Sequence, residues 1–155
     1  MKKQSVPIIH LQMVKDAEII YGGSKMESPK EAASLVKMFL GDVDRECRVV
    51  CATDTKMKPT HIQIVGIGAM NYCPASIPEI FKAALLSNAA NILLFHNHPS
   101  GDVTPSKEDI QLTKRVVEAG KLLGIPLQDH IILGEADNFY SFRKSGGFLE
   151  EESIN

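Results

Sequence analysis

The sequence lacks the features that mark several classes of protein. It contains no cluster of lysines and arginines, and its formal net charge is -2, so the electrostatic footprint of a dedicated DNA- or RNA-binding protein is missing. The apolar stretch near the N-terminus is too short for a membrane span or a signal-peptide core, and His10 and Gln12 interrupt it. We therefore expect a cytoplasmic protein with neither a nucleic-acid nor a membrane partner.

Paired cysteines are also missing. The three cysteines, Cys47, Cys51 and Cys73, have none of the C-x-x-C spacing of redox motifs or zinc ribbons. An odd number of unpaired cysteines favours reduced thiols in a cytosolic compartment, where each serves as a small buried apolar side chain. Internal repeats and low-complexity segments are absent as well.

What remains is the composition of one ordinary globular domain. The chain has 155 residues, of which 44% are hydrophobic and 23% are charged, which is close to average soluble usage and far from the signature of disorder. We expect an N-terminal strand or arm over residues 1–28, with the strand at Val6 to Val14. A globular domain over residues 29–149 and a polar tail over 150–155 follow.

Hydrophobic periodicity and helix caps predict alternating strands and helices. Ser28 and Ser76 each begin an S-x-x-E capping box, Thr104-Pro105 opens a longer helix whose apolar stripe includes Ile110, and residues 91–96 form a continuous apolar run typical of a central buried strand. The predicted helices span 29–41, 77–88 and 104–123, and the predicted strands span 45–53, 61–70, 91–96, 127–134 and 139–142. This order predicts a mixed α/β fold with a layered sheet flanked by helices.

The chemically informative stretch begins at the end of the central strand with His96-Asn97-His98. Residues two apart in an extended chain point to the same face, so the two imidazoles can meet at one point. Asp109 lies three residues after Ser106 in the first turns of the next helix, which places a carboxylate and a hydroxyl on one helical face. Two imidazoles and one carboxylate form a familiar catalytic zinc set that leaves one coordination position for water.

A hydrolytic zinc site also needs a carboxylate that transfers protons without binding the metal. Glu46, at the start of a predicted strand, is our candidate for this general base. Glu31 and Glu79 are already assigned to capping boxes, and Glu108 points away from the side of the helix that carries Asp109.

These residues carry a resemblance to a known family. His-x-His, seven further residues, Ser, two further residues and Asp, with an upstream Glu, resembles the JAMM motif of MPN or JAB-domain metalloproteases. Asp44-Arg45-Glu46, residues 76–84 and 88–109, and the stretch from Leu127 to Gly134 resemble the catalytic domain of RadC-like proteins. The resemblance covers residues 31–142. RadC-like proteins usually carry a helix-hairpin-helix region before this domain, and we expect none in this chain.

The resemblance implies a cytidine-deaminase-like layered fold and hydrolysis of a peptide or isopeptide bond in a protein or peptide substrate. It implies that His96, His98 and Asp109 bind Zn²⁺, that Glu46 is the general acid/base, and that Ser106 donates a hydrogen bond to the oxyanion. One alternative is a non-catalytic zinc-containing module that binds a protein or DNA partner. Another is a metal-dependent hydrolase that acts on a different bond, by deamination or phosphodiester cleavage.

Several nearby residues keep two readings. Ser106 could serve the local backbone at the start of its helix. Pro99-Ser100-Gly101 forms a turn, in which Ser100 is also a candidate substrate contact, and we expect Asp102 to be a turn residue rather than a fourth ligand. Asp129 and His130 could support a metal ligand from behind or could form a buried structural pair.

Overall fold

A computed structural model describes residues 1–23, 25–68 and 76–147 of the chain. Its elements, in chain order, are α1 (Pro29–Leu40), β1 (Cys47–Thr53), β2 (Pro59–Ile67), α2 (Ile77–Leu86), β3 (Asn91–Asn97), α3 (Lys107–Leu123), β4 (Leu127–Leu133) and β5 (Phe139–Ser141). The five strands form one sheet in the order β2-β1-β3-β4-β5. Only β3 and β4 are parallel, joined through α3, and the other neighbours are antiparallel. The predicted mixed α/β class is confirmed.

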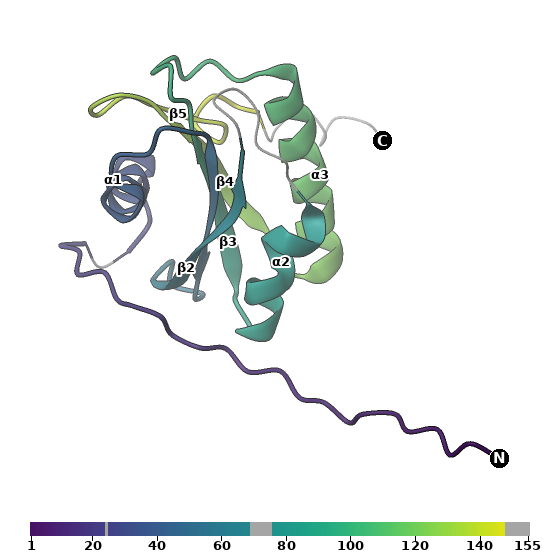
Figure 1. The fold of residues 1–155 in the computed structure, drawn as a ribbon. Coiled ribbons are helices and arrows are strands. Elements are labelled where there is room, and N and C mark those ends of the chain that lie inside the picture. Colours follow the sequence, from purple (N-terminus) through teal and green to yellow (C-terminus); the bar gives the residue numbers. More distant parts are fainter. Residues whose placement is uncertain (24, 69–75, 148–155) are drawn as a thin grey trace.

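Helices cover both faces of this sheet (Figure 1). One apolar cluster joins α1 to Val49, Cys51, Leu93 and Phe95 on one face. A second cluster joins α2 and α3 to the alternate residues of the same strands, such as Val50 and Leu94, on the opposite face. Since side chains alternate along a strand, the central strand β3 is buried on both sides, as its continuous apolar run predicts.

The N-terminal segment differs from one expectation. Residues 6–14 form no strand; they extend away from the sheet with exposed apolar side chains such as Ile8 and Leu11 (Figure 1). Of the two expected alternatives, the strand is therefore wrong and the segment is an extended arm, because β-propensity without a neighbouring strand supplies no ladder of hydrogen bonds. Part of the strand predicted over 61–70 and all of the 150–155 tail, together with Cys73, lie outside the described residues.

The start and the buried face of α3 also differ from the sequence prediction. The helix predicted to open at Thr104-Pro105 begins at Lys107 instead. The Asp102 carboxylate accepts hydrogen bonds from the amide and the hydroxyl of Thr104, which holds that residue in the preceding loop. Ile110 is 41% exposed rather than part of the apolar stripe, because the buried face of α3 runs through Asp109, Leu112 and Thr113.

The two predicted S-x-x-E caps have different outcomes. The Ser28 hydroxyl accepts a hydrogen bond from the amide of Glu31 at 3.2 Å, as an N-cap should. Ser76 precedes α2 but makes no side-chain capping bond, and Glu79 pairs instead with Lys82 at 2.6 Å. The capping box predicted at Ser76 is therefore wrong.

This difference predicts unequal effects of two matched substitutions. Ser28→Ala should lower the free energy of unfolding by about 1 kcal/mol, because it removes the partner of the Glu31 amide. Ser76→Ala is the control, since each serine precedes a helix that has proline in its first turn. Chemical denaturation of both variants measures the difference, and equal losses would contradict the capping role of Ser28.

Among the described residues, no helix combines the length and the apolar composition needed to cross a bilayer.

Candidate metal centre

The side chains of the site converge because of strand alternation and register. Arg48 in β1 is paired with His96 in β3, and His96 is paired with Ile132 in β4, so these positions share one face. His130, two residues before Ile132, shares this face too. It is the face that α2 and α3 cover. The N-terminal end of α3 reaches the C-terminal end of β3 there, and Asp109 meets the histidines.

Four of the predicted residues come together. One ligand atom from each of Glu46, His96, His98 and Asp109 can be chosen so that all lie within 4.8 Å of one another. The two Nε2 atoms of His96 and His98 are 3.0 Å apart. The Asp109 carboxylate lies 3.1 Å from the Nε2 of His96 and 3.5 Å from the Nε2 of His98. The structure thus places the predicted ligands around one point.

The chemistry of this donor set fits a divalent cation. The Nδ1 of His98 lies 2.6 Å from the main-chain oxygen of Asp102. A carbonyl oxygen can only accept, so Nδ1 carries the proton and the Nε2 of a neutral His98 presents its lone pair to the cluster. Imidazole nitrogen and carboxylate oxygen are ligands that zinc and other transition metals accept. His96, His98 and Asp109 would hold the ion.

Glu46 lies slightly farther from this point. It precedes β1, is 6% exposed, and places Oε1 3.9 Å from the Nε2 of His96. The same oxygen lies 3.7 Å from the guanidinium of the buried Arg48. Burial raises the pKa of the Glu46 carboxyl, while Arg48 and then His98 act against this rise. A carboxyl with a raised pKa is suited to accept and release a proton near neutral pH.

Asn97 holds the segment that carries Glu46, a role that sequence reasoning missed. Its side-chain oxygen accepts a hydrogen bond from the amide of Cys47 at 2.8 Å, and its side-chain nitrogen donates to the carbonyl of Arg45 at 3.0 Å. The carbonyl of Glu46 accepts from the amide of Gly68 at 2.9 Å. The backbone on both sides of Glu46 is therefore tied to the strand that carries the histidines. The only sequence signal was the position of Asn97 between them.

Ser106 and Asp109 form a reciprocal cap at the start of α3. The Ser106 hydroxyl accepts from the amide of Asp109 at 3.1 Å, and the Asp109 carboxylate accepts from the amide of Ser106 at 2.9 Å. The local backbone role weighed for Ser106 is therefore present. Its predicted role at the oxyanion stays a prediction.

The turn that follows the histidines is present as predicted. The amide of Gly101 donates to the carbonyl of His98 at 2.9 Å, and Gly101 has a φ of 82°, which favours glycine. Asp102 is exposed and accepts hydrogen bonds from Thr104, so it acts as the expected turn residue.

Asp129 and His130 separate, because neighbours in a strand face opposite sides of the sheet. The Nε2 of His130 lies 2.8 Å from the Nδ1 of His96, so His130 supports a predicted ligand. Asp129 lies on the face that α1 covers, where it accepts from the hydroxyl of Ser141 at 2.5 Å and from the amide of Arg143 at 3.0 Å.

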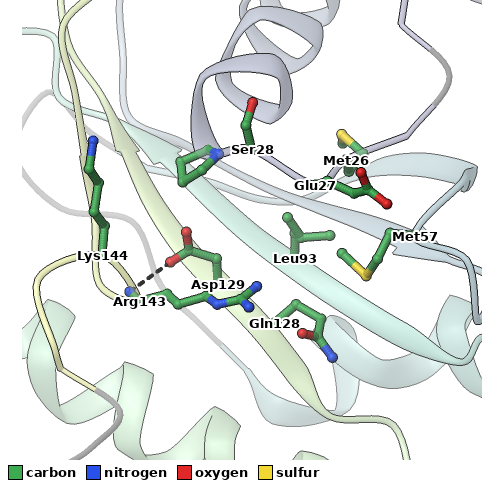
Figure 2. Close-up of a pocket in the computed structure, with 10 residues that line it drawn as sticks. Met26, Glu27, Ser28, Met57, Leu93, Gln128, Asp129, Arg143 and Lys144 are labelled. Carbon is green, nitrogen blue, oxygen red and sulfur yellow. Dashed lines mark hydrogen bonds between the residues drawn. The ribbon is translucent and has the colours of Figure 1, made fainter.

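The cavity in Figure 2 lies on the face of the sheet that α1 covers. Its volume is ≈ 390 Å³, and Leu93 and Asp129 point into it toward the start of α1. Its lining includes none of the four converging residues. Asp129 therefore lies away from the candidate metal centre, where its hydrogen bonds to Ser141 and Arg143 are structural.

The pKa shifts of the three predicted ligands follow from burial and from their mutual contacts. Burial lowers the pKa of His96 to about 4. The Asp109 carboxylate raises the pKa of His98, and burial opposes this rise. Burial works to raise the pKa of Asp109, yet the two imidazoles and the amide of Ser106 bring it well below its usual value. The cluster keeps a carboxylate and a neutral His96 at neutral pH.

Comparison with known proteins agrees with this site. The family described as RadC-like JAB domain matches residues 26–147. The chain is 42% identical over 123 residues to a UPF0758 protein of Roseiflexus castenholzii, which covers 79% of this chain and 52% of that protein. A UPF0758 protein of Desulforamulus reducens is 43% identical over 121 residues, covering 78% and 52%. One of Methanosarcina mazei is 40% identical over 126 residues, covering 81% and 54%.

A mixed sheet between helices, with a largely buried Glu-His-His-Asp group that could hold a metal ion beside the end of its central strand, defines a JAB-type domain. The chain belongs to the RadC-like JAB domain family. It spans about half the length of the curated relatives that it matches.

The Asn97 contacts predict a local change in amide exchange. Asn97→Ala should speed hydrogen exchange at the Cys47 amide about fivefold or more, because that amide loses its partner. Asn97→Asp keeps an acceptor oxygen and should preserve more of the protection. NMR-detected exchange measures both, with the amide of Val50 in the same strand as the internal control. Unchanged exchange at Cys47 in Asn97→Ala would show that Asn97 does not hold this segment.

The histidine shifts predict how the stability of the metal-free protein depends on pH. Because the pKa of His96 is about 4 in the folded protein rather than 6.5, the unfolded chain binds a proton below pH 6.5 that the folded chain does not bind. The pKa of His130 is also well below 6.5, and burial is the main cause. The free energy of unfolding should therefore fall between pH 7 and pH 5.

His98 acts in the opposite direction, since its raised pKa contributes stability below pH 6.5 that is lost as the pH rises. His98→Gln should therefore show a larger fall between pH 7 and pH 5 than the wild type. Chemical denaturation in the presence of a chelator measures both proteins. A wild type that is more stable at pH 5 than at pH 7 would contradict the lowered pKa values of His96 and His130.

Proposed function

We propose that this domain is a zinc-dependent hydrolase that cleaves a peptide or isopeptide bond in a protein or peptide substrate. The observation that carries the proposal is the position of Glu46. Donor atoms of His96, His98 and Asp109 lie around one point, and a second buried carboxylate, that of Glu46, places its Oε1 3.9 Å from the Nε2 of His96. A purely structural metal site does not require this additional carboxylate.

The roles of the side chains follow from their chemistry. Zinc, when bound, lowers the pKa of water and polarises a carbonyl group. Glu46 accepts the proton of the attacking water and later gives it to the departing amine, for which its raised pKa is suited. His96, His98 and Asp109 hold the ion. The Ser106 hydroxyl donates a hydrogen bond to the oxygen of the scissile carbonyl as negative charge develops there.

We also propose that the protein acts in the cytoplasm. Cys47 and Cys51 are buried free thiols, which suits a reducing compartment. The low net charge supports a protein or peptide partner over a nucleic acid. The matched stretch covers about half the length of the relatives, so the activity proposed here is that of the shared domain.

The proposal predicts that Glu46→Gln keeps zinc but loses hydrolysis. The variant removes the proton acceptor and leaves His96, His98 and Asp109 in place. Zinc-loaded protein is incubated with a cell extract, and new α-amino and lysine ε-amino groups are labelled and identified by mass spectrometry. Wild type should generate a defined set of new amines, with a loss of at least about 100-fold in Glu46→Gln.

Glu108→Gln is the matched control, because Glu108 is an exposed carboxylate beside Asp109 in the same helix. It should match the wild type in amine release. All three proteins should hold one zinc per chain by elemental analysis. Hydrolysis retained in Glu46→Gln would disprove the assigned base. Bound zinc without any new amine would favour a binding module or an enzyme that acts on another bond.

A further inference from the structure

We infer that His130 and Thr113 are positioning residues that fix the tautomer of His96, so that its Nε2 lone pair faces the metal. The inference rests on the proposed zinc site. It concerns two residues outside the predicted ligand set, and it follows from a chain of three buried hydrogen bonds on the face of the sheet covered by α3.

The chain of contacts ends on a main-chain oxygen, which fixes the direction of every hydrogen bond in it. The Thr113 hydroxyl lies 2.7 Å from the carbonyl oxygen of Asp109. Because a carbonyl oxygen can only accept, the single hydroxyl proton of Thr113 points to it. The hydroxyl oxygen then has only lone pairs to offer to its other neighbour, the Nδ1 of His130, which is 2.7 Å away. His130 must therefore donate from Nδ1.

The protonation of His130 determines that of His96. His130 is fully buried, and its two ring nitrogens contact the Thr113 hydroxyl and the Nδ1 of His96 rather than a carboxylate, so it is neutral and carries one ring proton. With this proton on Nδ1, the Nε2 of His130 is an acceptor. The Nδ1 of His96, 2.8 Å away, must then donate to it. A neutral His96 with its proton on Nδ1 has a free lone pair on Nε2, which is the atom that faces Asp109 and His98.

The tautomers of His96 and His98 are thus fixed in the same way, by a main-chain carbonyl that accepts the last hydrogen bond. For His98 the terminal acceptor is the carbonyl of Asp102, in direct contact with Nδ1. For His96 the terminal acceptor is the carbonyl of Asp109, reached through His130 and Thr113. This second chain also links the metal ligand on β3 to the helix turn that supplies the ligand Asp109. Partners that fix ligand tautomers in this way commonly change metal affinity by about 10- to 100-fold when they are removed.

A set of threonine variants tests this inference through zinc affinity rather than turnover. Thr113→Val has nearly the same shape but no hydroxyl, so the Nδ1 of His130 loses its acceptor and the tautomer of His96 is no longer fixed. We expect zinc to bind about 10- to 100-fold more weakly, measured by competition with a chromophoric chelator. Thr113→Ser keeps the hydroxyl and should restore affinity to within about threefold of the wild type.

Thr53→Val is the matched control for the loss of a buried threonine hydroxyl. Thr53 is 0% exposed and lies at the far end of β1, where its hydroxyl contacts the sulfur of Met57. It should leave zinc affinity unchanged. Chemical denaturation of all variants without metal accounts for differences in stability.

Imidazole ¹⁵N NMR of the metal-free protein reports the tautomer directly. In the wild type, His96 and His130 should each show a protonated Nδ1 and an unprotonated Nε2, and in Thr113→Val this pattern should change. A wild type that binds no zinc would contradict the proposed function. A wild type that binds zinc, with Thr113→Val equal to it in affinity and in the NMR pattern, would overturn only the inference on His130 and Thr113.

Discussion

The reciprocal cap between Ser106 and Asp109 is the interaction on which the site depends. One oxygen of the Asp109 carboxylate accepts the amide of Ser106, and the other lies 3.1 Å from the Nε2 of His96. The same side chain therefore caps the start of α3 and is the third predicted ligand. A helix start leaves amide groups without partners and favours a negative charge, so the carboxylate is stabilised there even without a cation. The geometry of the ligand follows from the folding of the helix.

The sheet supplies the remaining constraint. Antiparallel pairing of β1 with β3 sets Arg48 opposite His96, and parallel pairing of β3 with β4 places His130 behind the same histidine. A shift of one residue in either register would turn these side chains to the face of α1. The apolar residues between them, Leu94 and Ile132, are fully buried and hold this register. The polar centre thus depends on the apolar core on either side of it.

Much of this arrangement was readable from the sequence, because it follows local rules. The spacing of His96 and His98 on one strand, and of Asp109 in the first turns of a helix, predicted the ligand set, and the structure brings those residues together with Glu46. The split between Asp129 and His130 was also within reach, since adjacent strand residues cannot face the same ligand. Treating them as a pair overlooked that alternation.

Other features depended on contacts that local patterns do not contain. The side-chain amide of Asn97 forms hydrogen bonds with the backbone of Arg45 and Cys47, which are 52 and 50 residues earlier in the sequence, so only the pairing of β1 with β3 reveals its role. Ser28 and Ser76 begin the same S-x-x-E pattern, yet only Ser28 forms a side-chain cap. Apolar periodicity placed Ile110 in the buried stripe of α3. The buried face instead contains Asp109 and Thr113, whose polar side chains are hydrogen-bonded and which a pattern of apolar residues cannot detect.

The two readings of Ser106 are not exclusive, because they use different parts of the hydroxyl group. Capping uses a lone pair of the oxygen, which accepts the amide of Asp109. Stabilising an oxyanion uses the hydroxyl proton, which this cap leaves available. The cap also fixes the side chain on the turn that carries Asp109, which limits the directions in which that proton can point. Preorganisation of a donor in this way is what makes electrostatic stabilisation effective, so the structural role of Ser106 supports its proposed chemical role.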